Sequence, residues 1–262
     1  RCLVGSEMCI RDRIQGLPDG FKEGPYAFKH NNKYYLTFPW VQDKTETLAY
    51  AMADSPMGPF TFTGIIMDES PSGCWTNHHS ITEYNGQWYL FYHHNDYSPN
   101  FDKNRSARID SLFFNTDGTI KKVKPTLRGV GITDARSKIQ IDRYSTISPY
   151  GVTIDYLEPS NTFEGWQTLF NRAGTWVTYN KVDFGTTPVK RLKARVRSEK
   201  GGAITLRTPG EKGMTIAELP IKPTGKWTEI STNVSNAPTS MQDLIITQTG
   251  ENPVAVDWIS FE

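Results

Sequence analysis

Hydrophobic and polar residues in the first half of the chain form short runs separated by turn residues, and one pattern occurs twice. Residues 28–38 (FKHNNKYYLTF) and 82–92 (TEYNGQWYLFY) each have an Asn-Asn or Asn-Gly pair followed by an aromatic run. Such a pair between two strand-like runs is the signal of a two-residue β-hairpin. Further strand-like runs follow at residues 48–53 and 107–114. A strand-rich unit that repeats at about 50 residues is typical of a β-propeller blade.

From about residue 148 onward the pattern changes to many short strands with alternating apolar and polar positions. Gly, Pro or Asn residues separate most of these runs, and no helical period occurs among them. Seven or more such strands in one region are typical of a β-sandwich. The strands are expected at residues 176–184, 192–198, 203–207, 215–219, 227–234, 243–249 and 254–261.

Between the two halves lies a stretch whose composition predicts a linker. The repeat of the first half ends near Thr126, and residues 127–147 contain two glycines and a mixed-charge run. We therefore expect a propeller part at residues 14–130, a linker at 131–147 and a sandwich at 148–262. Two propeller units are too few to close a ring, so the first half alone is expected to have open sheet edges.

Composition narrows the classes of function. The 29 Lys and Arg residues nearly balance the 28 Asp and Glu residues, which leaves a formal charge of +1. Nucleic-acid binding depends on a clustered excess of basic residues, so nucleic acid is not an expected partner. No apolar run reaches the roughly 18–20 residues that a membrane helix needs, so a membrane is not expected either. The cysteines Cys2, Cys9 and Cys74 form neither a disulfide framework nor a CxxC metal pair.

The first thirteen residues do not follow the pattern of the remaining chain. Residues 1–13 (RCLVGSEMCIRDR) lack a start Met, the apolar segment of a signal peptide and any strand or helix period. Their LVGSEMCIRD stretch resembles the conceptual translation of an adapter used in preparing sequencing libraries. We interpret residues 1–13 as an assembly artefact fused to a gene truncated at its 5′ end. The alternative is an ordinary disordered N-terminus.

Glu23 is a candidate for acid–base chemistry, because a propeller places ligands at its axis, where the starts of the inner strands converge. The offset of the repeat makes Glu23 equivalent to Asn77, and Gly24 equivalent to His78. The Gly and Pro after Glu23 fix a turn, and the aromatic residues that follow are expected to desolvate its carboxyl group in part. Such desolvation suits a general acid that works near neutral pH. The alternative is a surface glutamate at the start of a strand.

Four of the five histidines occur as two pairs, at residues 78–79 and 93–94. A two-residue turn at residues 85–86 places His78 opposite His93. Two imidazoles across a hairpin can ligate zinc, but no Cys and no HExxH partner is placed to supply a third ligand. The alternative is a polar cavity lining in which one histidine lies near a hydrated cation.

Several motifs of the first half occur in the order that a known family has. They are Glu23-Gly-Pro-Tyr with Lys29 and Tyr34-Tyr-Leu, Ala51-Met-Ala-Asp-Ser-Pro-Met-Gly-Pro-Phe60, Asn77-His-His-Ser-Ile81 with Gly86-Gln-Trp-Tyr-Leu-Phe-Tyr-His93, and Arg105-Ser106 with Asn115-Thr-Asp-Gly-Thr-Ile120. Over about residues 17–130 the chain resembles glycoside hydrolase family 43. The resemblance implies a five-bladed propeller that hydrolyses arabinofuranosyl or xylosyl bonds of plant hemicellulose with inversion of configuration.

The same resemblance implies roles for individual residues. Glu23 matches the general acid of the family, and His78 matches the histidine near the axis that helps to hold a central hydrated calcium ion. His79 is expected to line the substrate site. Arg105 matches a substrate-side arginine that anchors a sugar hydroxyl or carboxylate, and its alternative is a solvated loop arginine. No stretch resembles the motifs of the family's two aspartates, one of which is the general base, so the chain as given is expected to be nearly inert.

The second half resembles a family 6 carbohydrate-binding module, a jelly-roll β-sandwich. The resemblance rests on Ala173-Gly-Thr-Trp-Val-Thr-Tyr179 with Val182-Asp-Phe-Gly185, Gly201-Gly-Ala-Ile-Thr-Leu-Arg207, Thr224-Gly-Lys-Trp227 and Val256-Asp-Trp-Ile-Ser-Phe261. Such modules stack a sugar ring on aromatic residues at a loop-end cleft, for which Trp176, Tyr179 and Trp227 are candidates. Alternatively these residues belong to the core. Where the family commonly has an Asn, this chain has Ala255, and nearby Asn252 is the substitute we consider.

The expected fold class is therefore all-β, with about two blades of an incomplete five-bladed propeller followed by a sandwich module. The expected function is that of an inverting α-L-arabinofuranosidase or β-xylosidase. The expected partners are arabinoxylan, arabinan or their oligosaccharides, the expected metal is calcium, and no organic cofactor is expected. The family resemblance implies an extracellular or periplasmic location. Two alternatives remain: a polysaccharide-binding protein without catalysis, and a zinc hydrolase built on the paired histidines.

Overall fold

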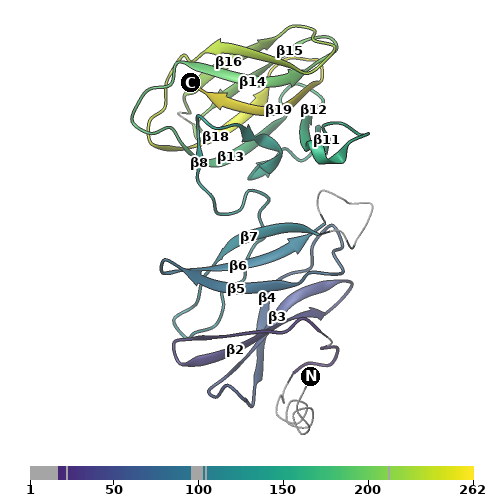
Figure 1. Cartoon of the computed structure of the whole chain (residues 1–262), viewed down its shortest axis with the longest axis vertical. Coiled ribbons are helices and arrows are strands. Elements are labelled where there is room, and N and C mark those ends of the chain that lie inside the picture. The colour runs from purple at the N-terminus through teal and green to yellow at the C-terminus, as the bar shows by residue number, and fades with distance from the viewer. Residues whose placement is uncertain (1–16, 22, 96–102, 104, 212) are drawn as a thin grey trace. The chain divides into compact units, whose positions relative to one another are not determined.

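The computed structural model describes residues 17–21, 23–95, 103, 105–211 and 213–262 (Figure 1). Apart from two short 3-10 turns, every regular element in these residues is a strand, which confirms the predicted all-β class. The chain divides into two compact units, Arg1–Thr126 and Leu127–Glu262. No helix in the described residues is long and apolar enough to cross a bilayer. The interpretation of residues 1–13 lies outside what the structure describes.

Two antiparallel meanders make up the first unit. The strands of the first sheet lie side by side in chain order: β1 (Tyr26–His30), β2 (Lys33–Val41), β3 (Glu46–Ala53) and β4 (Thr61–Met67). The second sheet has the same order with β5 (His79–Tyr84), β6 (Gln87–His94) and β7 (Ser106–Leu112). Sheets of consecutive antiparallel strands are the repeating units of a propeller, so the predicted blades are present.

The hairpin turns of the two blades have the conformation that their sequences predict. The φ angles are 44° and 61° at residues 31–32, and 51° and 77° at residues 85–86. Positive φ at both central residues is the geometry of a type I′ turn, whose twist matches the twist of the flanking strands. Tyr84 therefore pairs with Gln87, as a two-residue turn requires. This register confirms the predicted alignment of the second hairpin.

Aromatic residues of the repeated pattern pack the two blades against each other. The ring of Phe28, on β1, stacks on Tyr35 at a centroid distance of 4.6 Å and lies 5.2 Å from Trp88 on β6. Buried aliphatic residues of both sheets, including Leu48 and Leu90, extend this cluster. The repeat thus supplies the apolar faces that hold the blades together.

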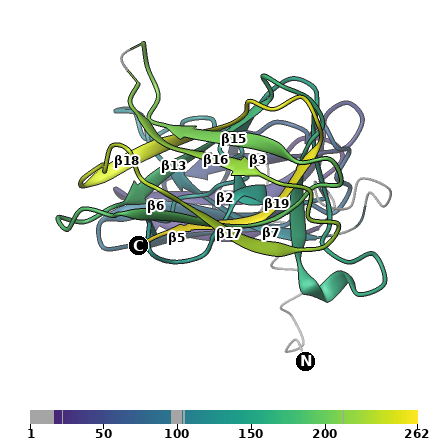
Figure 2. The same ribbon diagram turned by 90° about the horizontal axis from the view of Figure 1, so that it is seen from above.

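The second unit is a sandwich of two sheets whose inner faces form one apolar core. The order of the first sheet is β10-β13-β18-β15-β16, and that of the second is β11-β12-β19-β14-β17. Figure 2 shows β15 and β16 in one layer and β17 and β19 in the other. The strands are β10 (Thr146–Ile147), β11 (Val152–Tyr156), β12 (Trp166–Phe170), β13 (Trp176–Asp183), β14 (Arg191–Arg197), β15 (Gly202–Arg207), β16 (Thr215–Ile221), β17 (Thr228–Asn233), β18 (Met241–Gln248) and β19 (Val254–Phe261).

The predicted linker at residues 131–147 is part of the sandwich. Its strand β8 (Thr133–Asp134) pairs with β13, and its strand β9 (Ile139–Gln140) pairs with β19. A 3-10 turn (Ile141–Arg143) and strand β10 follow, and the Ile139 and Ile141 side chains are buried in the core. Strands of two residues are too short to show an alternating pattern, so sequence reasoning did not recognise them.

Candidate functional site

Glu23 and His78 come from different blades and lie beside each other. Glu23 precedes β1, His78 directly precedes β5, and the Oε1 atom of Glu23 lies 3.9 Å from the Nε2 atom of His78. The two side chains are 69% and 37% exposed. The structure therefore brings together the two residues that the sequence predicts as general acid and axial histidine, next to the starts of β1 and β5.

Gly24 allows the backbone next to Glu23 to lie directly against the imidazole ring of His78. It has a φ angle of +66°, and a Cβ atom at this position would lie 2.5 Å from Cδ2 of His78 and 3.1 Å from Cδ of Pro39. Any side chain here would both strain the backbone and push against the imidazole ring. The sequence placed Gly24 next to Glu23 in a turn, but its contact with the other blade was not predicted.

The expected desolvation of the Glu23 carboxyl group is not seen among the described residues. Aromatic neighbours were expected to desolvate its carboxyl group, yet this side chain is 69% exposed. The ring of the nearest following aromatic residue, Tyr26, lies 6.4 Å from the ring of His79. The described blades therefore position the carboxyl group without covering it.

His79 forms a hydrogen bond from the second blade to the first. Its Nε2 atom lies 2.6 Å from Oγ1 of Thr37, and that hydroxyl donates to the carbonyl oxygen of Tyr26 at 3.0 Å. Because the Thr37 proton is used, we assign the proton of His79 to Nε2, which donates to Thr37. Burial, helped by nearby His78, lowers the pKa of His79 to about 4, so the ring is neutral near pH 7.

Sequence reasoning did not single out Thr37. The Asn-Asn turn fixes its register opposite Tyr26, but its contact with His79, 42 residues further along, depends on how the blades pack. A repeat signal alone does not show which side chains meet across two blades.

His93 lies opposite His78, as the hairpin register predicts. The centroids of the two rings are 6.3 Å apart, and the Nε2 atom of His93 lies 3.1 Å from Oγ1 of Thr76. Burial lowers the pKa of His93 to about 4, and the cationic Arg105 adds to this shift. Arg105 is exposed and directly precedes β7.

A buried amide side chain lies in the same segment. Asn77 is 0% exposed, and neither its Oδ1 nor its Nδ2 atom forms a hydrogen bond with the described residues. Burying a polar group without a partner costs about 1–3 kcal/mol, so native proteins nearly always satisfy such groups. The geometry indicates a partner that the described residues do not supply.

The fit of a metal to these residues can be tested from their chemistry. Calcium takes about six to eight oxygen ligands, whereas His78 offers one nitrogen and has the single carboxylate of Glu23 beside it. Among the described residues no group of three or more His, Cys, Asp or Glu side chains could hold a metal ion. The described residues alone therefore supply neither a full set of calcium ligands nor the zinc site of the alternative interpretation, and we derive no chemical step through a metal.

The three aromatic candidates of the sandwich occupy different environments. Tyr179 is only 4% exposed and belongs to the core, so it offers no ring face to a sugar. Trp227 is half-buried, and the guanidinium groups of Arg195 and Arg197 lie 5.4 and 5.1 Å from its ring centroid. Trp176 is half-buried and lines a surface pocket. The expectation for Tyr179 is thus corrected, because this position of β13 faces inward.

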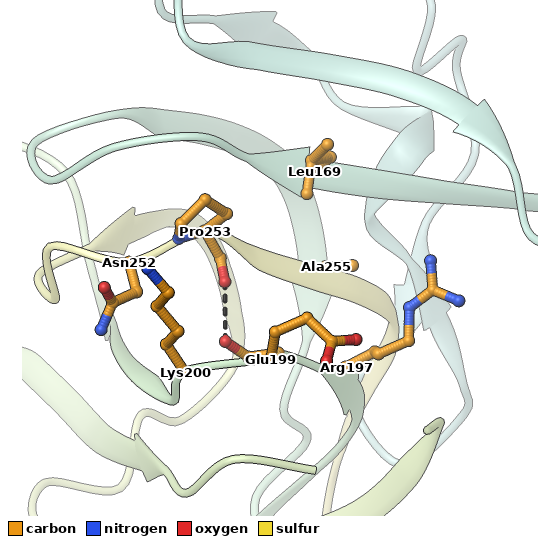
Figure 3. A pocket seen from close by; sticks show the side chains of 8 residues that line it. Leu169, Arg197, Glu199, Lys200, Asn252, Pro253 and Ala255 are labelled. Carbon is orange, nitrogen blue, oxygen red and sulfur yellow. Dashed lines mark hydrogen bonds between the residues drawn. The ribbon is translucent and has the colours of Figure 1, made fainter. Parts of the chain in front are cut away.

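A pocket of about 570 Å³ opens on the sandwich (Figure 3). Ala255 and Asn252 both line it, so the proposed substitute lies in the same pocket as the residue that replaces the family's Asn. Charged residues from the end of β14 and the following turn also line it, with Glu199 lying between Arg197 and Lys200 in the view of Figure 3. The lining residues are Leu169, Arg197, Ser198, Glu199, Lys200, Asn252, Pro253 and Ala255.

Comparison with known proteins matches the two halves of the chain to two different family models. Residues 10–120 match the model of the glycosyl hydrolases family 43, and residues 148–262 match that of the carbohydrate binding module family 6. An arabinoxylan arabinofuranohydrolase of Paenibacillus polymyxa is 28% identical over 258 residues, covering 87% of this chain and 40% of the relative. A beta-xylosidase of Xylanibacter ruminicola is 43% identical over 109 residues, covering 41% of this chain and 32% of the relative.

A solved structure supports the fold. The crystal structure of a glycoside hydrolase family 43 arabinoxylan arabinofuranohydrolase from Bacillus subtilis, in complex with cellotetraose, matches with a TM-score of 0.58 at 24% identity. The match covers 92% of this chain and 54% of that chain. The chain spans less than half the length of the two relatives described above.

The first unit is thus similar to glycoside hydrolases of family 43, and the second unit is similar to carbohydrate-binding modules of family 6. Both resemblances seen in the sequence are thereby confirmed.

Proposed function

We propose that the chain is part of an inverting glycoside hydrolase that cleaves α-L-arabinofuranosyl or β-xylosyl bonds of plant hemicellulose, with the sandwich as its polysaccharide-binding module. The observation that carries this proposal is the placement of Glu23, whose carboxyl group lies 3.9 Å from His78 in the segment that matches family 43. The names of the relatives, arabinoxylan arabinofuranohydrolase and beta-xylosidase, support the substrate class.

Glu23 would act as the general acid. It donates its proton to the glycosidic oxygen as the bond to the sugar carbon breaks. A carboxylate outside this chain accepts a proton from water, and this water attacks the opposite face of the sugar. Inversion requires the two carboxyl groups to be about 6.5–9.5 Å apart, with room for that water between them.

The neighbouring histidines suit this role. His79 and His93 are neutral near pH 7 because their pKa values are lowered to about 4. Neutral rings add no positive charge to the site. The roles of His79 and Arg105 in substrate binding remain predictions.

Calcium and an extracellular or periplasmic location complete the proposal, and both come from the family resemblance. The calcium part is tested by metal analysis of the dialysed protein and by activity after chelation. Stoichiometric zinc in place of calcium would favour the metallohydrolase alternative.

Glu23→Gln in the full-length product of the source gene is the decisive variant. Turnover of arabinoxylan should fall at least about a hundredfold, which is typical for loss of general acid catalysis. Turnover of a p-nitrophenyl glycoside should fall much less, because nitrophenolate leaves without needing a proton. Glu83→Gln, at an exposed position of β5, is the matched control. Near-normal turnover of arabinoxylan by Glu23→Gln would rule out the acid role.

The second candidate function is polysaccharide binding without catalysis, which the pocket of about 570 Å³ on the sandwich favours. It predicts that the protein is retarded in gels that contain arabinoxylan while releasing no reducing sugar. Release of reducing sugar by the full-length protein, abolished by Glu23→Gln, excludes this alternative.

A further inference from the structure

A second and smaller pocket lies on the sandwich, between the loop after β10 and the loop between β12 and β13. Its volume is about 310 Å³, enough for one or two sugar rings. No acidic residue lines it, and Arg172 is its one charged residue. The lining residues are Ser148, Pro149, Tyr150, Arg172, Ala173, Gly174, Thr175 and Trp176.

Close packing fixes the two loops against each other. The backbone N–H of Ser148 donates to the carbonyl of Trp176 at 2.9 Å, and the N–H of Trp176 reaches Oγ of Ser148 at 3.3 Å. Gly151 has a φ angle of +82°, and a Cβ atom there would lie 2.6 Å from Cγ2 of Thr175 and 3.2 Å from Nε of Arg172. A glycine at residue 151 thus lets one loop lie directly against the arginine of the other.

Arg172 is held in place but has no anionic partner among the described residues. Its guanidinium group lies 4.5 Å from the ring centroid of Tyr150, a cation–π arrangement. No ion pair of the described residues includes this arginine. Its planar fork of N–H donors remains available to a carboxylate, which it can bind through two parallel hydrogen bonds.

Aromatic surface lies beside this cation. Tyr150 is 66% exposed, and the ring of Trp176, also in the lining, is half-buried. Aromatic rings next to hydrogen-bonding groups suit a ligand with one apolar face and polar edges, which is the character of a sugar ring. The larger pocket differs, because Glu199 lies there together with its two basic residues.

We propose that this smaller pocket binds a sugar ring that carries a carboxylate, that is, a uronic acid side group of the polysaccharide. Arg172 pairs with the carboxylate, and Tyr150 and Trp176 contact the ring. This inference rests on the proposed function insofar as it takes a hemicellulose to be the ligand of the module. It adds a preference for acid-substituted chains and a site separate from the larger pocket.

Three related oligosaccharides test the inference with the intact chain, and two of them differ only in the charge of one carboxyl group. They are a xylotetraose that bears one glucuronic acid, the methyl ester of that same oligosaccharide, and unsubstituted xylotetraose. Binding is followed by the NMR shift of the Trp176 indole N–H. The acid should bind about tenfold more tightly than its ester, because only the ionised carboxylate accepts two charge-assisted hydrogen bonds from the guanidinium group. The preference should weaken at high salt.

Variants assign the preference to the site. Arg172→Gln should make the affinities for acid and ester equal, whereas Arg172→Lys should retain part of the preference, because it keeps the charge but loses the planar fork. Tyr150→Ala should weaken acid and ester alike. Arg207→Gln, at an exposed position of β15 that lines neither pocket, is the matched control and should leave the preference unchanged. Thermal unfolding of each variant verifies that the sandwich is folded.

The possible results separate this inference from the proposed function. Equal affinity of the unchanged chain for acid and ester overturns the inference, and so does a preference that survives Arg172→Gln. The hydrolase proposal stands in both cases if the full-length protein releases sugar. Absence of binding of all three probes overturns the inference, and absence of hydrolysis in addition overturns the proposed function.

Discussion

The Nε2 atom of His79 lies 2.6 Å from Oγ1 of Thr37, so a hydrogen bond joins the start of β5 to the middle of β2. Thr37 is 0% exposed, and its hydroxyl donates a hydrogen bond to the carbonyl oxygen of Tyr26 in β1. His79 directly follows His78, so this connection lies next to the contact between His78 and Glu23. It fixes the relative position of the two blades where their inner strands begin.

Removing this hydroxyl should weaken the first unit. Thr37→Val keeps the shape of the side chain but leaves the buried N–H of His79 without an acceptor, at a cost of about 1–3 kcal/mol in the free energy of unfolding. Thr37→Ser keeps the hydroxyl and should lose clearly less. Urea unfolding followed by fluorescence measures both. Equal stability of the Val variant and the unchanged protein would contradict the importance of this bond.

Gly24→Ala should strain the backbone and, in addition, should move the imidazole ring of His78. The added Cβ atom would lie 2.5 Å from Cδ2 of His78 and would displace the ring from Glu23. Gly86→Ala is the matched control, because Gly86 also has a positive φ angle, +77°, but nothing lies within 4 Å of its Cβ position. Both variants should lose about 1 kcal/mol of stability from backbone strain.

NMR of the histidine rings distinguishes these two glycine variants. Only Gly24→Ala should shift the signals of His78. A shift of equal size in Gly86→Ala, or none in Gly24→Ala, would contradict the contact.

The first unit should lose stability as the pH falls from about 6.5 to about 4. His79 and His93 have folded-state pKa values of about 4, below the ordinary value of 6.5, so the unfolded chain binds protons more readily in this range. Their contribution to stability is therefore full above pH 6.5 and is lost as the pH falls through about 4. Arg105→Gln should raise the pKa of His93, since the arginine charge lowers it. NMR titration of the ring protons measures this pKa directly.

The sandwich should show the opposite dependence at Asp142. Burial raises the pKa of its carboxyl group to about 6, although Arg143 opposes the shift. The folded state then binds the proton more tightly than the unfolded chain does, so this contribution is present below about pH 4 and is lost as the pH rises through 6. Asp142→Asn should remove the loss, which is worth roughly 3 kcal/mol in total.

Unfolding at pH 4.5 and at pH 7 measures this effect. The stability of Asp142→Asn relative to the unchanged protein should increase between these two pH values. Asp155→Asn, at an exposed position of β11, should show no such increase. A parallel dependence for Asp142→Asn and the unchanged protein would contradict the raised pKa.

Local signals in the sequence predicted most strands of the structure. Alternation and turn residues located all seven expected strands of the sandwich, from Trp176–Asp183 to Val254–Phe261, within a few residues of their ends. Strands β4, β11 and β12 were not predicted. In β4, Gly64 and two register shifts against β3 interrupt the alternation. Because a bulge moves successive side chains to the other face, a period of two is not visible there.

The features of the site that follow from the pairing of strands within one hairpin were predictable from the sequence. The Asn-Gly turn was sufficient to place His78 opposite His93. The contact of Gly24 with His78 and the bond from His79 to Thr37 were not predictable, because both depend on packing between blades. The burial of the Tyr179 ring was not predictable either. The sequence pattern of an alternating strand does not show which of its two faces the core covers.

The pairing of residues 133–147 with both sheets bears on how the module could be excised or fused to other proteins. The family match begins at residue 148, but a cut there would remove β8 and β10 from one sheet and β9 from the other. The backbone edge of β13, and the part of β19 that pairs with β9, would then be left open to other chains. The segment to excise or to fuse is therefore longer than the part that matches the family model, and it begins near Leu127, where the compact unit begins.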